Sequence, residues 1–190
     1  TQPVGQRSDH VFTPENVISG VNGSLERLRT DYLDLVQFHI SPSMQTLRES
    51  GSLEALKELQ RAGKVRFIGM SGTQPHLADQ IASGEFDVFQ IPYSALQREN
   101  EALITAAAEA GAGVVIRGGV AKGDHMTPVQ FLLRFTLSHP GMHTTIVGTA
   151  NPAHLQANAA TALLGPLPAD TYAEAKRRLD AVPEAMAPIR

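Results

Sequence analysis

Several polar residues of the sequence stand at the ends of short apolar runs. His39 follows LDLVQF, Ser71 follows VRFIGM, and Arg117 ends GVVIR. Gln90 lies within FDVFQI, and the pair Gly148-Thr149 follows TTIV. Short apolar runs predict buried strands, and polar side chains delivered by the carboxyl ends of many parallel strands are typical of enzyme sites. The spacing therefore predicts a site assembled from several strands.

The composition limits the chemistry that such a site could perform. The sequence contains no cysteine, which excludes a disulfide framework, a thiol nucleophile and a thiolate metal site, and fits a reducing compartment. His139 and His143 have a spacing that could align two metal ligands on a helix, but Pro140 and Gly141 between them break that helix. We therefore expect no metal site.

Charge and hydropathy exclude two classes of partner. The 16 basic and 19 acidic residues are scattered along the chain and leave a net charge of −3, so no basic patch for nucleic acid is apparent. No apolar run approaches the roughly 18 residues that a membrane-spanning helix needs, and the first residues lack the apolar stretch of a signal peptide. The sequence therefore predicts a cytoplasmic protein that binds neither nucleic acid nor membrane.

The elements that would position these side chains alternate between strands and helices. Helix signals start near Thr13-Pro14, Ser52, Pro75, Asn100, Thr127-Pro128, Asn151-Pro152 and Pro168. The predicted strands are Leu33–Phe38, Val65–Met70, Phe86–Ile91, Gly113–Arg117 and Thr144–Val147. Short apolar strands joined by helices indicate parallel pairing with both faces of the sheet covered, which is an α/β fold.

Two architectures suit this order, an open doubly wound sheet and a (β/α)₈ barrel. A doubly wound nucleotide-binding sheet should carry G-x-G-x-x-G after a strand, and the sequence has no such pattern. Polar residues at many strand ends favour the barrel, although a barrel needs eight strands and roughly 250 residues. We expect residues 1–190 to form a single domain that is part of a barrel.

Four phrases in this order resemble the aldo-keto reductase family: SLERLRTDYLDLVQFH, GKVRFIGMSG, FDVFQIPYS and TTIVGTANPAHLQAN. The resemblance covers almost everything from Val11 to Leu179. It implies a (β/α)₈ TIM barrel in which Leu33–Phe38 is the fourth strand and the later strands are the fifth to eighth. The first three strands would precede Thr1.

The resemblance also implies an activity, the NAD(P)H-dependent reduction of an aldehyde or ketone carbonyl in a small-molecule substrate. In the family, hydride passes to the carbonyl carbon while a tyrosine protonates the oxygen, assisted by a lysine that is paired with an aspartate. A histidine orients the carbonyl, and His39 matches it. The aspartate, tyrosine and lysine would come from the first three strands, so the chemistry would require a missing N-terminal portion.

Residues of three later strands match the family's nicotinamide site. Ser71 and Gln90 match side chains that hold the carboxamide, although the family usually has Ser-Asn where this chain has Ser71-Gly72. Arg117 ends the seventh strand, where relatives place an aromatic or arginine side chain over the nicotinamide face. The alternative for Arg117 is a surface ion pair. Tyr93 could lie near the same ring or belong to the packing, and we do not assign it to the site.

The other end of the cofactor would lie after the eighth strand. Gly148 and Thr149 would approach a phosphate group, helped by the N-terminus of the next helix, and Asn158 matches an asparagine that meets the adenine. Relatives often have a basic residue for the NADP 2′-phosphate where this chain has Ala150. The expected cofactor is NADP, with NAD left open.

Two features concern the completeness of the barrel. Relatives have a long cofactor-covering loop after the seventh strand, whereas this chain has only a few residues there, so a loop is predicted to be missing around residues 123–127. Five barrel strands would also leave two unpaired edge strands. The remaining strands would be supplied from elsewhere, or the five would form an open sheet or pair with a second copy as a homo-oligomer.

Three functional hypotheses remain. The first is a carbonyl reductase whose missing portion carries the other catalytic residues. The second is a binding or sensing protein that keeps the nicotinamide pocket without chemistry, as some barrel relatives do as channel-associated subunits. The third is a truncated, nonfunctional product. In the last predicted helix, the stretch KRRLD from Lys176 to Asp180 is interpreted as a solvated face.

Overall fold

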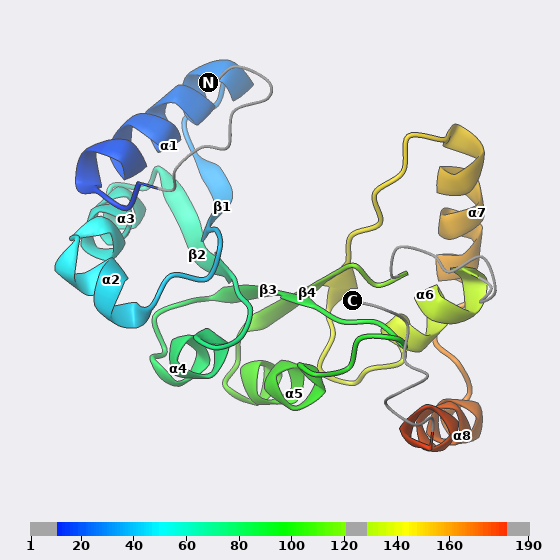
Figure 1. Cartoon of the computed structure of the whole chain (residues 1–190). Helices are drawn as coiled ribbons and strands as arrows, with labels where there is room; N and C mark the ends of the chain where they lie inside the picture. Colours follow the sequence, from blue (N-terminus) through cyan, green and yellow to red (C-terminus); the bar gives the residue numbers. More distant parts are fainter. Residues whose placement is uncertain (1–10, 121–128, 182–190) are drawn as a thin grey trace. The chain divides into compact units, whose positions relative to one another are not determined.

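The computed structural model describes residues 11–120 and 129–181 of the chain (Figure 1). The chain divides into two compact units, Thr1–Asp87 and Val88–Arg190, and each combines parallel strands with helices. The parallel pairing confirms the predicted α/β class. The prediction of one domain over residues 1–190 stays a prediction, and the predicted missing loop at 123–127 lies outside the described residues.

The first unit begins with a capped helix. The Oγ of Thr13 accepts the N–H of Asn16 at 3.3 Å, and Pro14 is the first helical residue, as predicted. One short helix, Met44–Glu49, was not predicted, because six residues are too few to show a helical period. The elements of this unit are α1 (Pro14–Leu28), β1 (Leu33–Phe38), α2 (Met44–Glu49), α3 (Ser52–Arg61), β2 (Val65–Ser71) and α4 (Leu77–Ala82).

Packing in the first unit aligns the ends of its two strands. β1 and β2 are parallel, and Phe38 lies opposite Met70. α3 packs against α1 and β2 and buries Leu53, Leu56 and Leu59, which are spaced to share one helix face. Each buried leucine contributes roughly 1.5–3 kcal/mol. This core holds the carboxyl ends of β1 and β2 at the same level.

The second unit is built around three parallel strands with β4 in the middle. Pro92 of β3 lies opposite Arg117 of β4, and Ile116 of β4 lies opposite Thr145 of β5. The elements are β3 (Val88–Pro92), α5 (Glu101–Glu109), β4 (Gly113–Arg117), α6 (Val129–Leu137), β5 (Thr144–Thr145), α7 (Pro152–Leu163) and α8 (Ala169–Asp180).

The two faces of this sheet differ in burial. Phe89 and Ile91 of β3, with Val114 and Ile116 of β4, are almost completely buried on the face that α5 helps to cover. Because successive residues of a strand point to opposite faces, the intervening residues of β3 and β4 point to the other face. They are only partly buried. The second face is therefore the one that carries polar side chains.

β5 is shorter than the predicted strand Thr144–Val147 and ends at Thr145. The N–H of Ile146 still donates to the carbonyl of Ile116 at 2.9 Å, which extends the pairing by one bond. β4 itself ends at Arg117, so no strand remains for the following residues to pair with. The apolar run predicted the strand, but the length of its neighbour determines where it stops.

Candidate active site

His39 and Ser71 lie at neighbouring strand ends in the first unit. Phe38 and Met70 lie opposite each other in the parallel register. His39 directly follows Phe38, and Ser71 directly follows Met70. Ser71 is the last residue of β2 and is buried, whereas the side chain of His39 is exposed. The unit therefore brings together an accessible imidazole and a sheltered hydroxyl, the two groups predicted to bind the carbonyl and the carboxamide.

Gln90 and Arg117 share one face of the sheet in the second unit. Gln90 is paired with Val115, and Pro92 with Arg117, so the two polar residues lie on the same face, two positions apart along the strands. Both side chains are partly buried. This is the face opposite the helix-covered core.

One atom of Arg117 has an unusual environment. The Nε of Arg117 is buried and has no hydrogen-bond partner among the described residues. A buried donor without a partner costs about 1–3 kcal/mol of stability. Such a donor at a strand end is therefore a candidate for contact with a ligand. Arg117 forms no ion pair with any described carboxylate, so the alternative of a surface ion pair is not seen among the described residues.

Gly148 and Thr149 form an exposed loop that leads from β5 into α7. The Oγ of Thr149 accepts the N–H of Asn151 at 3.1 Å, and Oδ1 of Asn151 accepts the N–H of Ala153 at 2.9 Å. These bonds hold the loop against the first turn of α7. A Cβ built on Gly148 would meet nothing within 4 Å, so the space beside its backbone is open. Asn158 is partly buried about two turns after the cap residue Asn151.

Tyr93, which directly follows β3, belongs to the packing of the second unit. Its ring is completely buried and stacks against Phe135 at 6.2 Å between centroids, with the edge of His139 at 5.2 Å. Its hydroxyl lies 3.2 Å from the hydroxyl of Tyr172 on α8. Burial raises the pKa of Tyr93 far above its ordinary range, and the bond to Tyr172 raises it further. Tyr93 therefore stays protonated and enclosed by protein.

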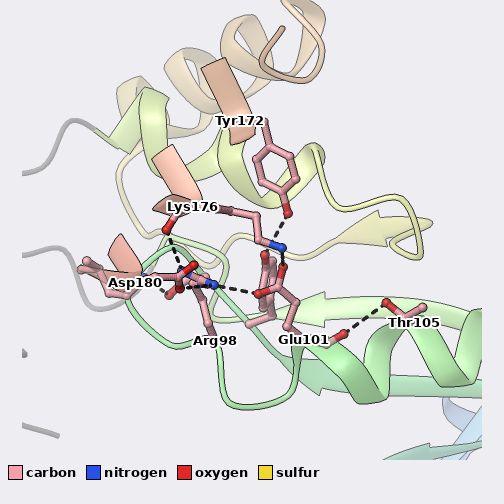
Figure 2. A network of polar contacts seen from close by, with 9 residues as sticks. Arg98, Glu101, Thr105, Tyr172, Lys176 and Asp180 are labelled. Carbon is pink, nitrogen blue, oxygen red and sulfur yellow. Dashed lines mark hydrogen bonds and ion pairs between the residues drawn. The ribbon is translucent and has the colours of Figure 1, made fainter. Parts of the chain in front are cut away.

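A network of charged side chains joins α8 to the segment before α5 (Figure 2). Glu101 accepts from Arg98 at 3.1 Å and from Lys176, and Arg98 also lies 2.8 Å from Asp180. Burial alone would raise the pKa of Glu101, but the bonds from Lys176 and Arg98 outweigh it and hold that pKa below its ordinary value. The carboxylate therefore stays ionised and ties α8 to the rest of the unit.

This network corrects the interpretation of KRRLD as a solvated helix face. Arg177 and Arg178 are largely exposed and pair with Glu174 of the same helix. Lys176, in contrast, reaches Glu101 across the unit. The sequence contains a signal for these contacts. Tyr172, Lys176 and Asp180 recur every four residues, so they share one side of the helix.

The described residues contain no group of three or more His, Cys, Asp or Glu side chains that could hold a metal ion. The Nδ1 atoms of His139 and His143 accept backbone N–H groups from Gly141 and Val114, at 3.1 and 3.0 Å. No helix within residues 11–120 and 129–181 is long and apolar enough to cross a membrane.

Comparison with known proteins identifies the class to which this fold and these strand ends belong. The pattern of the Aldo/keto reductase family matches residues 6–124, which is more than half of the chain. In structure, the chain is similar to the aldo-keto reductase AKR11C1 from Bacillus halodurans in its holo form. The TM-score is 0.79 at 24% identity, and the match covers 94% of this chain and 72% of that chain. This confirms the predicted aldo-keto reductase barrel fold, of which the described residues supply five strands.

The chain therefore belongs to the aldo/keto reductase family. It is 34% identical over 122 residues to "Protein tas" of Escherichia coli (strain K12), a match that covers 51% of this chain and 34% of that protein. It is 35% identical over 98 residues to the "NADH-specific methylglyoxal reductase" of the same organism, covering 48% of this chain and 29% of that protein. The chain thus spans about a third of the length of these curated relatives.

Proposed function

We propose that the chain is part of a cytoplasmic NAD(P)H-dependent oxidoreductase that reduces the carbonyl group of a small aldehyde or ketone. The observation that carries this proposal is the pairing of β1 with β2, which puts His39 and Ser71 at adjacent strand ends in a member of the aldo/keto reductase family. The aspartate, tyrosine and lysine of the reaction are proposed to come from a preceding portion of the polypeptide.

In this proposal each side chain has one task. An N–H of the His39 imidazole donates to the carbonyl oxygen and fixes the orientation of the carbonyl. The Ser71 hydroxyl and the Gln90 amide bind the carboxamide of the cofactor. A nicotinamide cofactor, when bound, supplies the hydride that is added to the carbonyl carbon. The protein's contribution is to align the acceptor carbon and to stabilise charge on its oxygen.

The residues of the second unit suit such a cofactor. A planar guanidinium can stack on an aromatic ring, and the unpartnered Nε of Arg117 is a donor with no described protein acceptor. The open space beside the backbone of Gly148 suits the close approach of a phosphate near the N-terminus of α7. Thr149 would bind the same phosphate, and Asn158 the adenine.

The preferred nucleotide is proposed to be NADP, with NAD as the alternative. A 2′-phosphate requires a cationic partner, and Ala150 offers none at the position where relatives often have a basic residue. His154, which is exposed in the first turn of α7, is the nearest ionisable group in that stretch. The similar methylglyoxal reductase of Escherichia coli is named as NADH-specific, which supports NAD as the alternative.

The test is to titrate the complete gene product containing this chain with NADPH and NADH while nicotinamide fluorescence is followed. Carbonyl turnover is then measured on a panel of small aldehydes and ketones. Saturable binding together with turnover supports a reductase. Binding without turnover on any member of the panel supports the alternative of a nucleotide-binding or sensing protein. Neither binding nor turnover would refute both.

A further inference from the structure

A buried polar cluster lies directly behind the strand ends that carry His39 and Ser71. We propose that Ser41 and Gln80 form a clamp that joins the loops following β1 and β2, and that Gln80 is a positioning residue for His39 and Ser71. The inference rests on the function proposed above for the two strand ends. The clamp itself is independent of that function.

Ser41 bonds to the backbone of the neighbouring loop. Its side chain is only 5% exposed, and its Oγ accepts the N–H of Thr73 at 3.1 Å. The same Oγ lies 2.9 Å from the carbonyl oxygen of Thr73, to which it can donate its proton. One hydroxyl therefore contacts both the backbone N–H and the backbone carbonyl of Thr73. Ser41 is two residues after His39, and Thr73 is two residues after Ser71.

Gln80 completes the connection from α4. Its side chain is fully buried, and its Nε2 donates to the carbonyl oxygen of Pro42 at 2.7 Å. Its Oε1 lies 3.3 Å from the Oγ of Ser41. One amide group thus contacts two consecutive residues of the loop after His39. A buried amide of this kind is costly to leave unpaired, so these contacts fix the loop strongly.

The loop that is held in this way is strained. Ile40 and Ser41 both have left-handed backbone angles, with φ of 64° and 52°. Such angles cost about 1–3 kcal/mol per residue, and the cost is greatest for a β-branched side chain such as that of Ile40. Strain persists only where surrounding contacts hold it, and the bonds of Ser41 and Gln80 are made by this same loop.

Gly72 provides the room for Gln80. A Cβ at position 72 would lie 2.7 Å from Cδ1 of Leu77 and 3.0 Å from Oε1 of Gln80, and both of these side chains are fully buried. Any side chain at this position would therefore displace one of them. The absence of a side chain at Gly72 therefore leaves space that the side chains of Leu77 and Gln80 occupy.

The first test measures the clamp without using activity. Gln80→Met in the complete gene product removes the hydrogen bond to Pro42 and the contact with Ser41 at similar volume. Gln60→Met is the matched control, because Nε2 of Gln60 donates at 3.0 Å to the carbonyl of Arg66, near the other end of β2. We expect hydrogen–deuterium exchange to accelerate by about tenfold or more in peptides covering residues 39–42 and 71–74 of Gln80→Met only. Equal exchange there in both variants would overturn the clamp. If Gln80→Met does not fold, Ser41→Ala is measured in its place.

The second test measures positioning. In an active wild-type protein, we expect Gln80→Met to reduce kcat by about tenfold and to weaken nicotinamide binding, while Gln60→Met leaves both within about twofold. Locally faster exchange with unchanged kcat and binding would show a clamp without a positioning role and would overturn that part of the inference. A wild type that turns over no carbonyl contradicts the proposed function instead, and the exchange experiment still decides whether the clamp exists.

Discussion

His39 combines accessibility with a rigid support. The preceding residue, Phe38, is buried and paired with Met70, whereas the imidazole itself is exposed. The following residues are held in left-handed conformations by Ser41 and Gln80. An exposed side chain on a fixed backbone can meet a ligand without large reorganisation, which is what orientation of a substrate carbonyl requires.

Replacement of His39 is expected to separate activity from stability. We expect His39→Ala in the complete gene product to reduce kcat/KM for carbonyl reduction by about 100-fold, because a hydrogen bond to the developing oxyanion is lost. The free energy of unfolding should change by less than about 0.5 kcal/mol, since the side chain is exposed. Steady-state kinetics and urea unfolding test the two parts. Undiminished kcat/KM would show that His39 does not orient the carbonyl.

Gly72 gives a prediction about packing. We expect Gly72→Ala to lower the free energy of unfolding by about 1–3 kcal/mol, because its Cβ would lie 2.7 Å from Cδ1 of the buried Leu77. The control is Gly20→Ala in α1, where a Cβ meets nothing within 4 Å and the better helix propensity should stabilise by about 0.5–1 kcal/mol. Denaturant unfolding of both variants should give shifts of opposite sign. A stabilising Gly72→Ala would contradict the crowding argument.

Specific contacts join α8 to the rest of the second unit. None of the residues of α8 is fully buried, so few side chains attach this helix. Tyr172 contacts Tyr93 and Phe135, and Lys176 pairs with the carboxylate of Glu101. Tyr172 and Lys176 extend from the same side of the helix, as Figure 2 shows. The attachment of this helix is therefore sensitive to single substitutions.

The tyrosine pair can be tested by removing one hydroxyl. We expect Tyr172→Phe to lower the free energy of unfolding by about 1–3 kcal/mol, because the buried hydroxyl of Tyr93 loses its described partner. The matched control is Tyr32→Phe, at a tyrosine that is 43% exposed, where we expect a change below about 0.5 kcal/mol. Equal effects in the two variants, measured by urea unfolding, would argue against the buried pair.

The ion pairs of Glu101 predict that the free energy of unfolding depends on pH. Its pKa in the folded protein lies below the ordinary value of 4.5, so its contribution to stability is fully present above that pH and is lost as the pH falls through the folded pKa. We expect Glu101→Gln to be less stable than the wild type by about 1–3 kcal/mol at pH 7. The difference should shrink when unfolding is measured below pH 4.5. A difference that does not vary with pH would exclude the ionised carboxylate as its source.

For the molecule as a whole, we expect binding of the proposed nucleotide to add to stability. The seven predicted site residues come from both compact units, with His39 and Ser71 in the first and Gln90, Arg117, Gly148, Thr149 and Asn158 in the second. A nucleotide that binds the folded protein but not the unfolded chain would shift the unfolding equilibrium toward the folded state. Its binding free energy would then add to the free energy of folding of the complete protein.

Thermal unfolding can measure this linkage. We expect NADPH at 100 times its dissociation constant to stabilise the complete gene product by about 2.7 kcal/mol, which should appear as a higher Tm. Arg117→Leu should reduce the increase at a fixed NADPH concentration, because the guanidinium is proposed to stack on the nicotinamide. The change in Tm with each nucleotide would also reveal the preference between NADPH and NADH. No increase with either nucleotide would count against a cofactor site.

Much of the fold follows from local sequence patterns. The bounds of β1 and β4 agree with the predicted strands Leu33–Phe38 and Gly113–Arg117, because most residues of each segment are apolar. Thr13 and Asn151 cap the helices whose starts they predicted. Four sequence phrases, among them SLERLRTDYLDLVQFH and FDVFQIPYS, also predicted the aldo-keto reductase family, and the family match confirms it.

The contacts that hold these strand ends could not be predicted from the order of residues. Ser41 and Gln80 are 39 residues apart, and Tyr93 and Tyr172 are 79 apart. Whether a serine, glutamine or tyrosine is solvated or buried with a partner depends on how helices pack over the strands, and no local pattern encodes that packing. Local patterns predicted the elements and the residues at their ends. Long-range packing determined which polar side chains support those ends, because a buried polar group is stable only where the folded chain supplies its partner.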